Sequence, residues 1–187
     1  LQNNPYCEED TVNPAGVYGI SKEEGERAVR NILESHIIIR TAWLYGTYGN
    51  NFVKTMLRLC QEREILRVVA DQYGCPTCAS DLAEAIVTIA DHLRNGKKMI
   101  WGTYHYCGHG ITTWHEFTEK ILEYAKSYII VKTRKIEAIT TAEYPTPAKR
   151  PAYSALNCDK IAKNFGIMTK PWQESLKGVI QNTISRQ

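Results

Sequence analysis

The sequence predicts an α/β fold, on the basis of three observations. Stretches with apolar residues at helical spacing alternate along the chain with short β-branched runs. The run "HIIIRTAWLYG" (36–46) is almost continuously apolar, which is typical of a strand buried on both faces of a parallel sheet. The hydrophobic content of 43% and the charged content of 23% are ordinary for a globular protein, and 187 residues suffice for one domain or for one and a part.

Helix and strand signals follow one another through the first half of the chain. Asn13 and Pro14 supply a cap and a first-turn proline, which predicts a helix from there to about Glu34. Its apolar stripe consists of Val17, Ile20, Ala28, Val29, Ile32 and Leu33. After the strand at 36–46, the expected elements are a helix at 50–63 capped by Asn50 or Asn51, a strand at 64–71 and a loop at 72–80.

The clearest helix signal lies in the second half, at 80–96. We expect Ser80 or Asp81 as its cap and Gly96 as its stop. The expected elements after it are a short strand running into a glycine turn at 101–110, a helix at 112–126 capped by Thr112 or Thr113, short strands at 128–133 and 135–140, a proline-marked loop at 142–156, and helices at 158–166 and 171–185.

Composition argues against several classes of protein. No run approaches the roughly 20 apolar residues of a membrane helix, so we expect no membrane contact. The net charge of +3 is mild, and the basic residues are scattered rather than gathered in a stripe, so we expect no nucleic-acid partner. The start of the chain has no basic region followed by an apolar one, and we therefore expect a cytoplasmic protein with reduced thiols.

Only one of the cysteine spacings fits a redox or metal motif, that of Cys75 and Cys78 in "CPTC". A zinc site needs a second Cys or His pair, and a thioredoxin-like motif follows a strand and opens a helix. This pair lies instead in a loop marked by Gly and Pro, so we interpret it as incidental. The five histidines also lack metal-binding spacing, and we expect no metal centre.

One stretch, "NPAGVYGISKEEGERAV" (13–29), has a spacing that is typical of catalysis. Tyr18 and Lys22 are four residues apart and therefore share one face of the expected helix. An ammonium beside a phenol favours the phenolate form, which eases proton transfer to a developing alkoxide, and it is also able to hold a cofactor hydroxyl. A solvent-facing tyrosine and lysine would give the same spacing, which arises often by chance.

The longer pattern "P…YG.SK..GE" (14–26) resembles the extended short-chain dehydrogenase/reductase superfamily. Four further blocks, "IRTAWLYGTYGNNFVKTML", "VVADQYGCPTCASDLA", "GTYHYCGHGITTWHEFT" and "YPTPAKRPAYSALN", resemble the dTDP-4-dehydrorhamnose reductase family in their order and separation. The resemblance implies the C-terminal part of a Rossmann-type doubly wound parallel sheet plus a small α/β substrate-binding domain. Residues 1–45 would end the Rossmann-type domain, and 46–187 would form mainly the substrate-binding domain, with about 80–107 returning to the Rossmann sheet.

The same resemblance implies a reaction. NADPH or NADH would reduce the 4-keto group of dTDP-4-dehydro-6-deoxy-L-mannose to give dTDP-L-rhamnose. Tyr18 would be the proton donor, and Lys22 the cation that tunes it and anchors the cofactor ribose. The implied partner is a dTDP-sugar, and a homodimer is compatible with the resemblance.

Four residues are candidates for substrate contact. Trp43 follows a buried strand at the sheet edge where α/β folds bind ligands, and its ring is able to stack on a base or a sugar. Asn50 and Asn51 are candidates through the resemblance, although a helix-capping role explains them as well. Arg150, in a proline-stiffened loop, is suited to bind a diphosphate. Weaker candidates are Asp71, Gln72 and Thr77, for which polar loop-capping roles are nearly as good an explanation.

No glycine-rich turn for a dinucleotide is found in this sequence. "GVYG", "GTYG" and "GHG" all lack the third glycine of such a strand-to-helix turn. We therefore expect the cofactor-binding front of the family to be missing here and the chain alone to be inactive. Two alternatives stay open: a non-catalytic regulatory or binding subunit of the same fold, and a nucleotide-sugar epimerase or dehydratase of the same superfamily.

Overall fold

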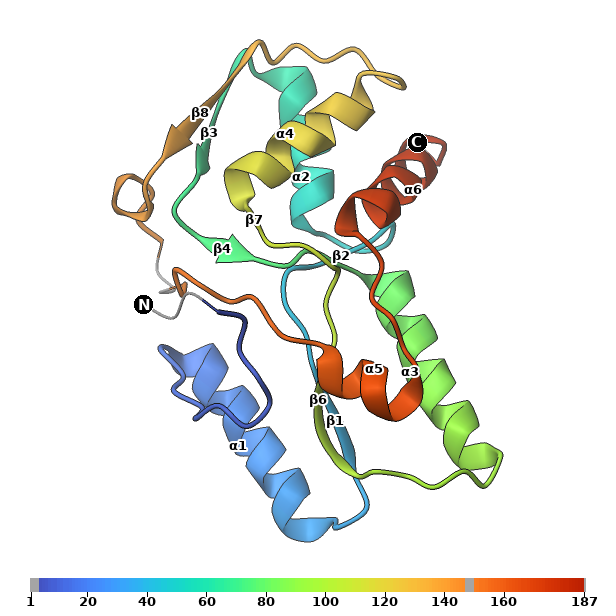
Figure 1. The fold of residues 1–187 in the computed structure, drawn as a ribbon. Coiled ribbons are helices and arrows are strands. Elements are labelled where there is room, and N and C mark those ends of the chain that lie inside the picture. Colours follow the sequence, from blue (N-terminus) through green and yellow to red (C-terminus); the bar gives the residue numbers. More distant parts are fainter. Residues whose placement is uncertain (1–3, 147–149, 187) are drawn as a thin grey trace.

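The computed structural model describes residues 4–146 and 150–186. Residues 147–149, which belong to the expected proline-marked loop, lie outside that range. Helices and short strands alternate, and the strands form four two-stranded pairs, three parallel and one antiparallel, among the described residues. Two of these strand pairs are each surrounded by helices, and we call each such pair with its helices one half of the structure. The two other strand pairs connect the two halves (Figure 1).

The first half is organised around β1 (Ile37–Arg40) and β6 (Gly102–His105), which run parallel. The helices α3 (Ala79–Arg94) and α5 (Asp159–Phe165) pack against this pair and bury its apolar side chains. The buried cluster comprises Ala85, Ile89, Tyr104, Tyr106, Ile161, Phe165 and Ile167. Segments from beyond residue 45 therefore complete the environment of β1, and the expected division into domains at that residue stays a prediction.

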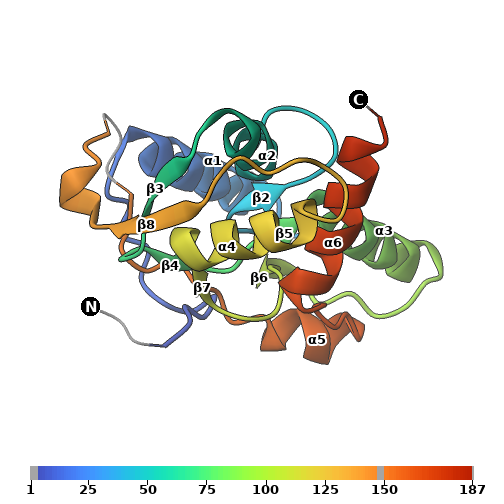
Figure 2. The same ribbon diagram turned by 90° about the horizontal axis from the view of Figure 1, so that it is seen from above.

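The second half pairs β3 (Ile65–Val69) with β8 (Lys135–Ile139), again in parallel. Three helices accompany this pair: α2 (Phe52–Glu62), α4 (Trp114–Ala125) and α6 (Trp172–Ile184). Seen from above, α4 lies between β8 and α6 (Figure 2). The buried side of α4 contacts α2, α6, β3 and β8, so α4 is the centre of the larger hydrophobic core.

Two very short strand pairs connect the halves. β2 (Leu44–Tyr45) runs parallel to β5 (Thr77–Cys78), and β4 (Tyr73–Gly74) runs antiparallel to β7 (Thr112–Thr113). The expectation of a plain loop at 72–80 is therefore wrong. Strands of two residues have no periodicity to read, and only their partners from distant segments define them.

The single strand expected at 36–46 is also interrupted. Trp43 has a φ of 47°, in the left-handed region that a bulky residue rarely adopts. The chain therefore turns between β1 and β2, and each strand pairs with a different partner. The backbone is held at this turn because the carbonyl oxygen of Trp43 accepts a hydrogen bond from the Thr77 amide at 3.1 Å.

The first helix, α1 (Val17–Ile32), begins later than the sequence suggests. Its N-cap is Gly16, so Asn13 and Pro14 precede the helix instead of starting it. None of its residues is buried, and the side chains of its apolar stripe are largely exposed, for example 83% for Val17 and 78% for Ile32. The structure thus corrects the expectation that this stripe faces a core within the described part of the chain.

Other local expectations have mixed outcomes. Asn51 caps α2 and Thr113 caps α4, the latter in a capping box with Glu116, as the sequence indicates. The cap of α3 is Cys78 rather than Ser80 or Asp81, because the helix starts directly after β5. Residues 128–133 form no strand; they connect α4 to β8. A short 3-10 helix, η1 (Thr141–Glu143), follows β8, and no described helix is long and apolar enough to cross a membrane.

A buried histidine ends β6. His105 is 1% exposed, its Nδ1 lies 3.0 Å from the carbonyl oxygen of Tyr6, and its Nε2 has no hydrogen-bond partner among the described residues. Burial lowers the pKa of His105 below its ordinary value; the Glu8 carboxylate opposes this shift, and Arg40 adds to it. The folded chain therefore holds this imidazole neutral.

We expect the free energy of unfolding to decrease as the pH falls below about 6.5, the ordinary histidine value. The unfolded chain takes up a proton at His105 in that range, whereas the folded chain does so only at lower pH. Each unit between the two pKa values corresponds to about 1.4 kcal/mol. Urea unfolding at about pH 7.5 and about pH 5.5 measures this loss.

Two variants separate His105 from the other titrating groups. His105→Gln should make the stability less dependent on pH, whatever its effect on the absolute value. His109→Gln, at an exposed position, should keep the dependence of the unaltered chain. The same slope in all three proteins would contradict the prediction.

Candidate functional site

Tyr18 and Lys22 lie on one exposed face of α1, near its start. Tyr18 is 77% exposed, and the Lys22 Nζ is 5.3 Å from the centroid of its ring. Among the described residues, neither the Tyr18 hydroxyl nor the Lys22 ammonium has a hydrogen bond or an ion pair. Both polar groups are therefore available to a ligand on the same side of the helix.

An ion-pair network attaches the middle of α1 to the end of β1. Arg40 donates to Glu26 from Nη2 at 2.6 Å, and Arg30 donates to the same carboxylate at 2.9 Å and to Glu23 at 2.6 Å. Burial raises the pKa of Glu26, but the hydrogen bonds from Arg40 and Arg30 outweigh it and hold the pKa below its usual value. This network fixes the rotation of α1 and hence the side on which Tyr18 and Lys22 lie.

Trp43, at the turn between β1 and β2, is held on one face by another tryptophan. Its indole stacks on that of Trp114 with 3.5 Å between the centroids and an angle of 7°. Gly74, in β4, lies close to the same indole, so that a Cβ there would be 2.5 Å from the Trp43 Nε1. One face of the ring that the sequence predicts as a substrate contact is therefore occupied by protein.

Trp114 is the residue that the sequence reasoning missed. It is the first residue of α4, and its Nε1 donates a hydrogen bond of 3.2 Å to the Gln72 Oε1. The Arg150 guanidinium carbon lies 5.9 Å from the centroid of its ring. Trp114 thus brings together Trp43 and Arg150, two predicted substrate contacts more than a hundred positions apart. Nothing in the spacing of these residues could have revealed this.

Asn50 and Asn51 differ in their contacts. The Asn51 Oδ1 accepts the Lys54 amide at 3.2 Å, and its Nδ2 donates to the Gly46 carbonyl at 2.7 Å. This side chain is therefore engaged at both ends in forming the loop before α2. Asn50 is exposed and has no such bond among the described residues.

The three weaker candidates are engaged in holding loops together. The Thr77 hydroxyl, which is buried, donates to the Ala42 carbonyl at 2.6 Å. The Gln72 Nε2 donates to the Thr141 hydroxyl at 3.0 Å. Desolvation raises the pKa of Asp71, which is an exposed residue, but the hydrogen bonds from Thr141 together outweigh it and lower the pKa below its usual value. All three contacts support the turn and loop around Trp43 and Trp114.

The predicted residues thus form two groups in the described structure. One is Tyr18 and Lys22 on α1, and the other is Trp43 and Arg150, joined through Trp114. No contact between described residues links the two groups directly. Each group offers exposed polar or aromatic surface, and the first holds both residues expected to act in proton transfer.

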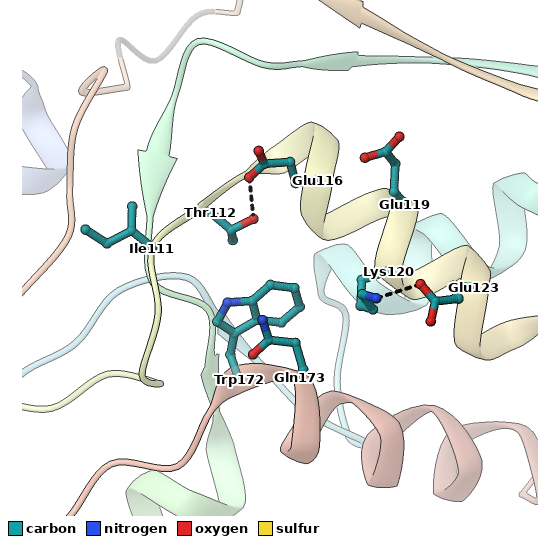
Figure 3. Close-up of a pocket in the computed structure, with 8 residues that line it drawn as sticks. All are labelled: Ile111, Thr112, Glu116, Glu119, Lys120, Glu123, Trp172 and Gln173. Carbon is teal, nitrogen blue, oxygen red and sulfur yellow. Dashed lines mark hydrogen bonds and ion pairs between the residues drawn. The ribbon is translucent and has the colours of Figure 1, made fainter.

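Two cavities in the described part of the chain lie away from both groups. One of about 480 Å³ opens between α4 and the start of α6, lined by Glu116, Glu119, Lys120 and Glu123 on one side and Trp172 on the other (Figure 3). Several of its polar groups are already engaged: Glu116 accepts from Thr112, and Lys120 pairs with Glu123 at 2.6 Å. A smaller one of about 310 Å³, between α3 and α6, also includes none of the predicted site residues.

The cysteines that lie close together in the structure are not those that are close together in the sequence. Cys75 lies in a small buried cluster with Cys107, whose Sγ is 3.6 Å from that of Cys158, whereas Cys78 belongs to the larger core. All six thiols are free, and the described residues include no group of three or more ligands placed to hold a metal ion.

A model of the RmlD substrate binding domain matches residues 2–185. The chain belongs to this family. The match covers every described element, including α1 with Tyr18 and Lys22 and the region around Trp43 and Trp114. Membership confirms the resemblance that the sequence motifs indicate.

Several relatives of this RmlD-family chain are named as reductases. A dTDP-4-dehydrorhamnose reductase of Aggregatibacter actinomycetemcomitans is 44% identical over 179 residues, which are 95% of this chain and 61% of that protein. Crystal structures of dTDP-4-dehydrorhamnose reductases from Clostridium acetobutylicum and from Bacillus anthracis, the latter with NADP, are each 39% identical, with TM-scores of 0.87 and 0.83. Each alignment covers 96% of this chain and 60% of the structure.

These comparisons confirm the fold class, because the matched structures are Rossmann-type reductases. The chain spans about 60% of the length of the relatives that it matches.

Proposed function

We propose that this chain supplies the proton donor and part of the substrate site of a dTDP-4-dehydrorhamnose reductase. The observation that carries the proposal is the pair of free groups on α1: the Tyr18 hydroxyl and the Lys22 ammonium face the same side, unbonded to other described residues. They occur in a chain of the RmlD family, 44% identical to a reductase of that name. The reaction would turn the 4-keto group of the dTDP-sugar into a hydroxyl.

Tyr18 would complete this reduction by donating its hydroxyl proton to the C4 oxygen as negative charge develops there. The Lys22 ammonium, one turn away, would stabilise the phenolate that remains. The Glu26–Arg40 ion pair would keep α1 in the orientation that presents both groups together. Solvent would then return the proton to Tyr18 after the product leaves.

The described residues fit the reduced nicotinamide cofactor in part. A free hydroxyl and a free ammonium on one helix face are the groups expected to hold a ribose, and NADP is present in the related Bacillus anthracis structure. When bound, the cofactor supplies the hydride to C4. The described glycines form no strand-to-helix turn with three glycines, so this chain's own share of cofactor binding would be Tyr18 and Lys22.

Trp43, Asn50 and Arg150 are the proposed contacts to the nucleotide part of the substrate. Arg150 has no ion pair among the described residues, which leaves its guanidinium available to a diphosphate. Asn50 is exposed at the start of the α2 loop. Asn51 would contribute indirectly, because its two bonds shape that loop.

A turnover assay tests this proposal. The chain would be joined to the part of the Aggregatibacter actinomycetemcomitans reductase that it does not cover, and we call this fusion the complemented enzyme. Oxidation of NADPH or NADH should depend on dTDP-4-dehydro-6-deoxy-L-mannose, and mass spectrometry should identify dTDP-L-rhamnose as the product. The ratio of the two rates would give the cofactor preference of the fusion.

Two other outcomes would favour the alternative functions. Binding of the dTDP-sugar without any oxidation of the cofactor would indicate a non-catalytic binding subunit. Conversion of a nucleotide sugar without net oxidation of NAD(P)H would indicate an epimerase or a dehydratase. Either result would contradict the reductase assignment.

A further inference from the structure

We propose that Trp114 is a positioning residue for nucleotide binding, which orients the indole of Trp43 toward the base of the dTDP-sugar. This inference rests on the proposed function, since it assumes that Trp43 contacts the nucleotide. It adds Trp114, the first residue of α4, which the sequence analysis does not count among the candidate site residues.

The backbone of Trp43 is fixed, but its side chain depends on its neighbours. The amide and the hydroxyl of Thr77 bind the carbonyl groups of Trp43 and Ala42, which secures the turn. No hydrogen bond of the Trp43 indole is present among the described residues. Its orientation therefore depends on packing, that is, on the parallel stack with Trp114 at 3.5 Å and on the close approach of Gly74 in β4.

Trp114, in contrast, is held from several directions. It begins α4 directly after the capping box of Thr113 and Glu116, so its backbone has a fixed place. Its ring packs on that of Phe52 with 4.5 Å between centroids, and its Nε1 is bonded to Gln72, which is only 6% exposed. Gln72 is in turn bonded to Thr141, so the indole plane of Trp114 is defined by side chains from three other segments.

A rigid indole therefore lies against a less constrained one. A parallel stack at this distance restricts the second ring to one plane, and the restriction is present before any ligand arrives. Pre-ordering of a side chain that contacts a ligand strengthens binding, because the ligand no longer has to immobilise it. Arg150, whose guanidinium carbon is 5.9 Å from the Trp114 ring, adjoins the same platform. Trp114 would thus align a base contact and a diphosphate contact without touching the base.

Affinity for dTDP tests this inference on the chain as it is. Trp114→Ala should weaken dTDP binding about 10-fold in calorimetry, in the range expected when one side chain has to be ordered on binding. Trp114→Phe should recover most of the affinity, because a flat ring still restricts Trp43. The matched control is Trp101→Ala, which removes a tryptophan that is 39% exposed and absent from the stack.

A second readout reports the stack itself. Two parallel indoles at 3.5 Å should give an exciton couplet in the far-ultraviolet circular dichroism spectrum. Trp43→Phe and Trp114→Phe should each abolish it, and Trp101→Ala should preserve it. A purely structural role for Trp114 would lower the thermal midpoint without changing the dTDP affinity of the folded chain.

Each outcome bears on a specific step. If the unaltered chain fails to bind dTDP, the positioning role of Trp114 is overturned, whereas the proposed function is decided separately by the turnover of the complemented enzyme. If the unaltered chain binds dTDP and Trp114→Ala binds equally well, only the positioning role is overturned. Tighter binding by Trp114→Ala would also overturn it, because Trp114 would then occupy the place of the base.

Discussion

Replacing Tyr18 by phenylalanine should lower the turnover of the complemented enzyme about 10²- to 10⁴-fold, the usual contribution of a positioned general acid. The change removes one hydroxyl from a ring that is 77% exposed and makes no buried contact, so stability should be unaffected. Cofactor affinity should stay near that of the unaltered protein, because Lys22 remains. Initial rates and NADPH binding, measured on the same preparation, separate the two effects.

The matched control for this change is Tyr128→Phe. Tyr128 is 40% exposed and lies beyond the end of α4, so the loss of its hydroxyl should leave the rate unchanged. Turnover of Tyr18→Phe equal to that of the control would remove Tyr18 from the mechanism. A loss of rate at Tyr18 without a loss of cofactor binding would support its role as proton donor.

Replacing Gly108 by alanine should produce the largest loss of stability among these variants. The added Cβ would overlap the carbonyl oxygen of Pro76 and lie 3.0 Å from the Trp172 Cβ. Because Pro76 presents backbone rather than a flexible side chain, and Trp172 is 5% exposed, neither has room to retreat. We expect the free energy of unfolding to fall by about 3 kcal/mol, the upper part of the usual range for an overpacked core.

Gly178→Ala is the control for this substitution. Gly178 lies inside α6, and a Cβ there would meet no atom within 4 Å. Alanine is favoured over glycine within a helix, so the free energy of unfolding should rise by about 0.5–1 kcal/mol. Urea unfolding of both variants measures the contrast. A Gly108→Ala protein as stable as the unaltered chain would show that the segment after β6 is not tightly packed against Pro76.

Local signals in the sequence predict most of the helices and several of their caps. Asn51 and Thr113 cap helices because a short polar side chain placed just before an apolar stripe satisfies the free amides of the first turn. The start of α3 is misplaced, because its entry from β5 is fixed by strand pairing rather than by the local cap at Ser80. The strand expected at 128–133 is absent because apolar β-branched residues also occur in connections that pack on a core, as Ile129 does.

The candidate site likewise has one part that the sequence predicts and one part that it does not. Tyr18 and Lys22 are close because they are four residues apart on one helix, and this proximity follows directly from helix geometry. The association of Trp43, Trp114 and Arg150 depends on the pairing of β2 with β5 and of β4 with β7, strands of two residues each. Such short pairs have no sequence pattern of their own.

Local sequence patterns are enough to predict the α/β class, the order of the main elements and the Tyr18–Lys22 pair. Each of these depends on residues that are neighbours along the chain, where propensity and spacing act directly. The turn at Trp43, the stack of its indole on Trp114 and the burial of His105 beside Arg40 arise only in the folded chain. These features depend on the simultaneous packing of segments far apart in the sequence, whose contact energies no local pattern encodes.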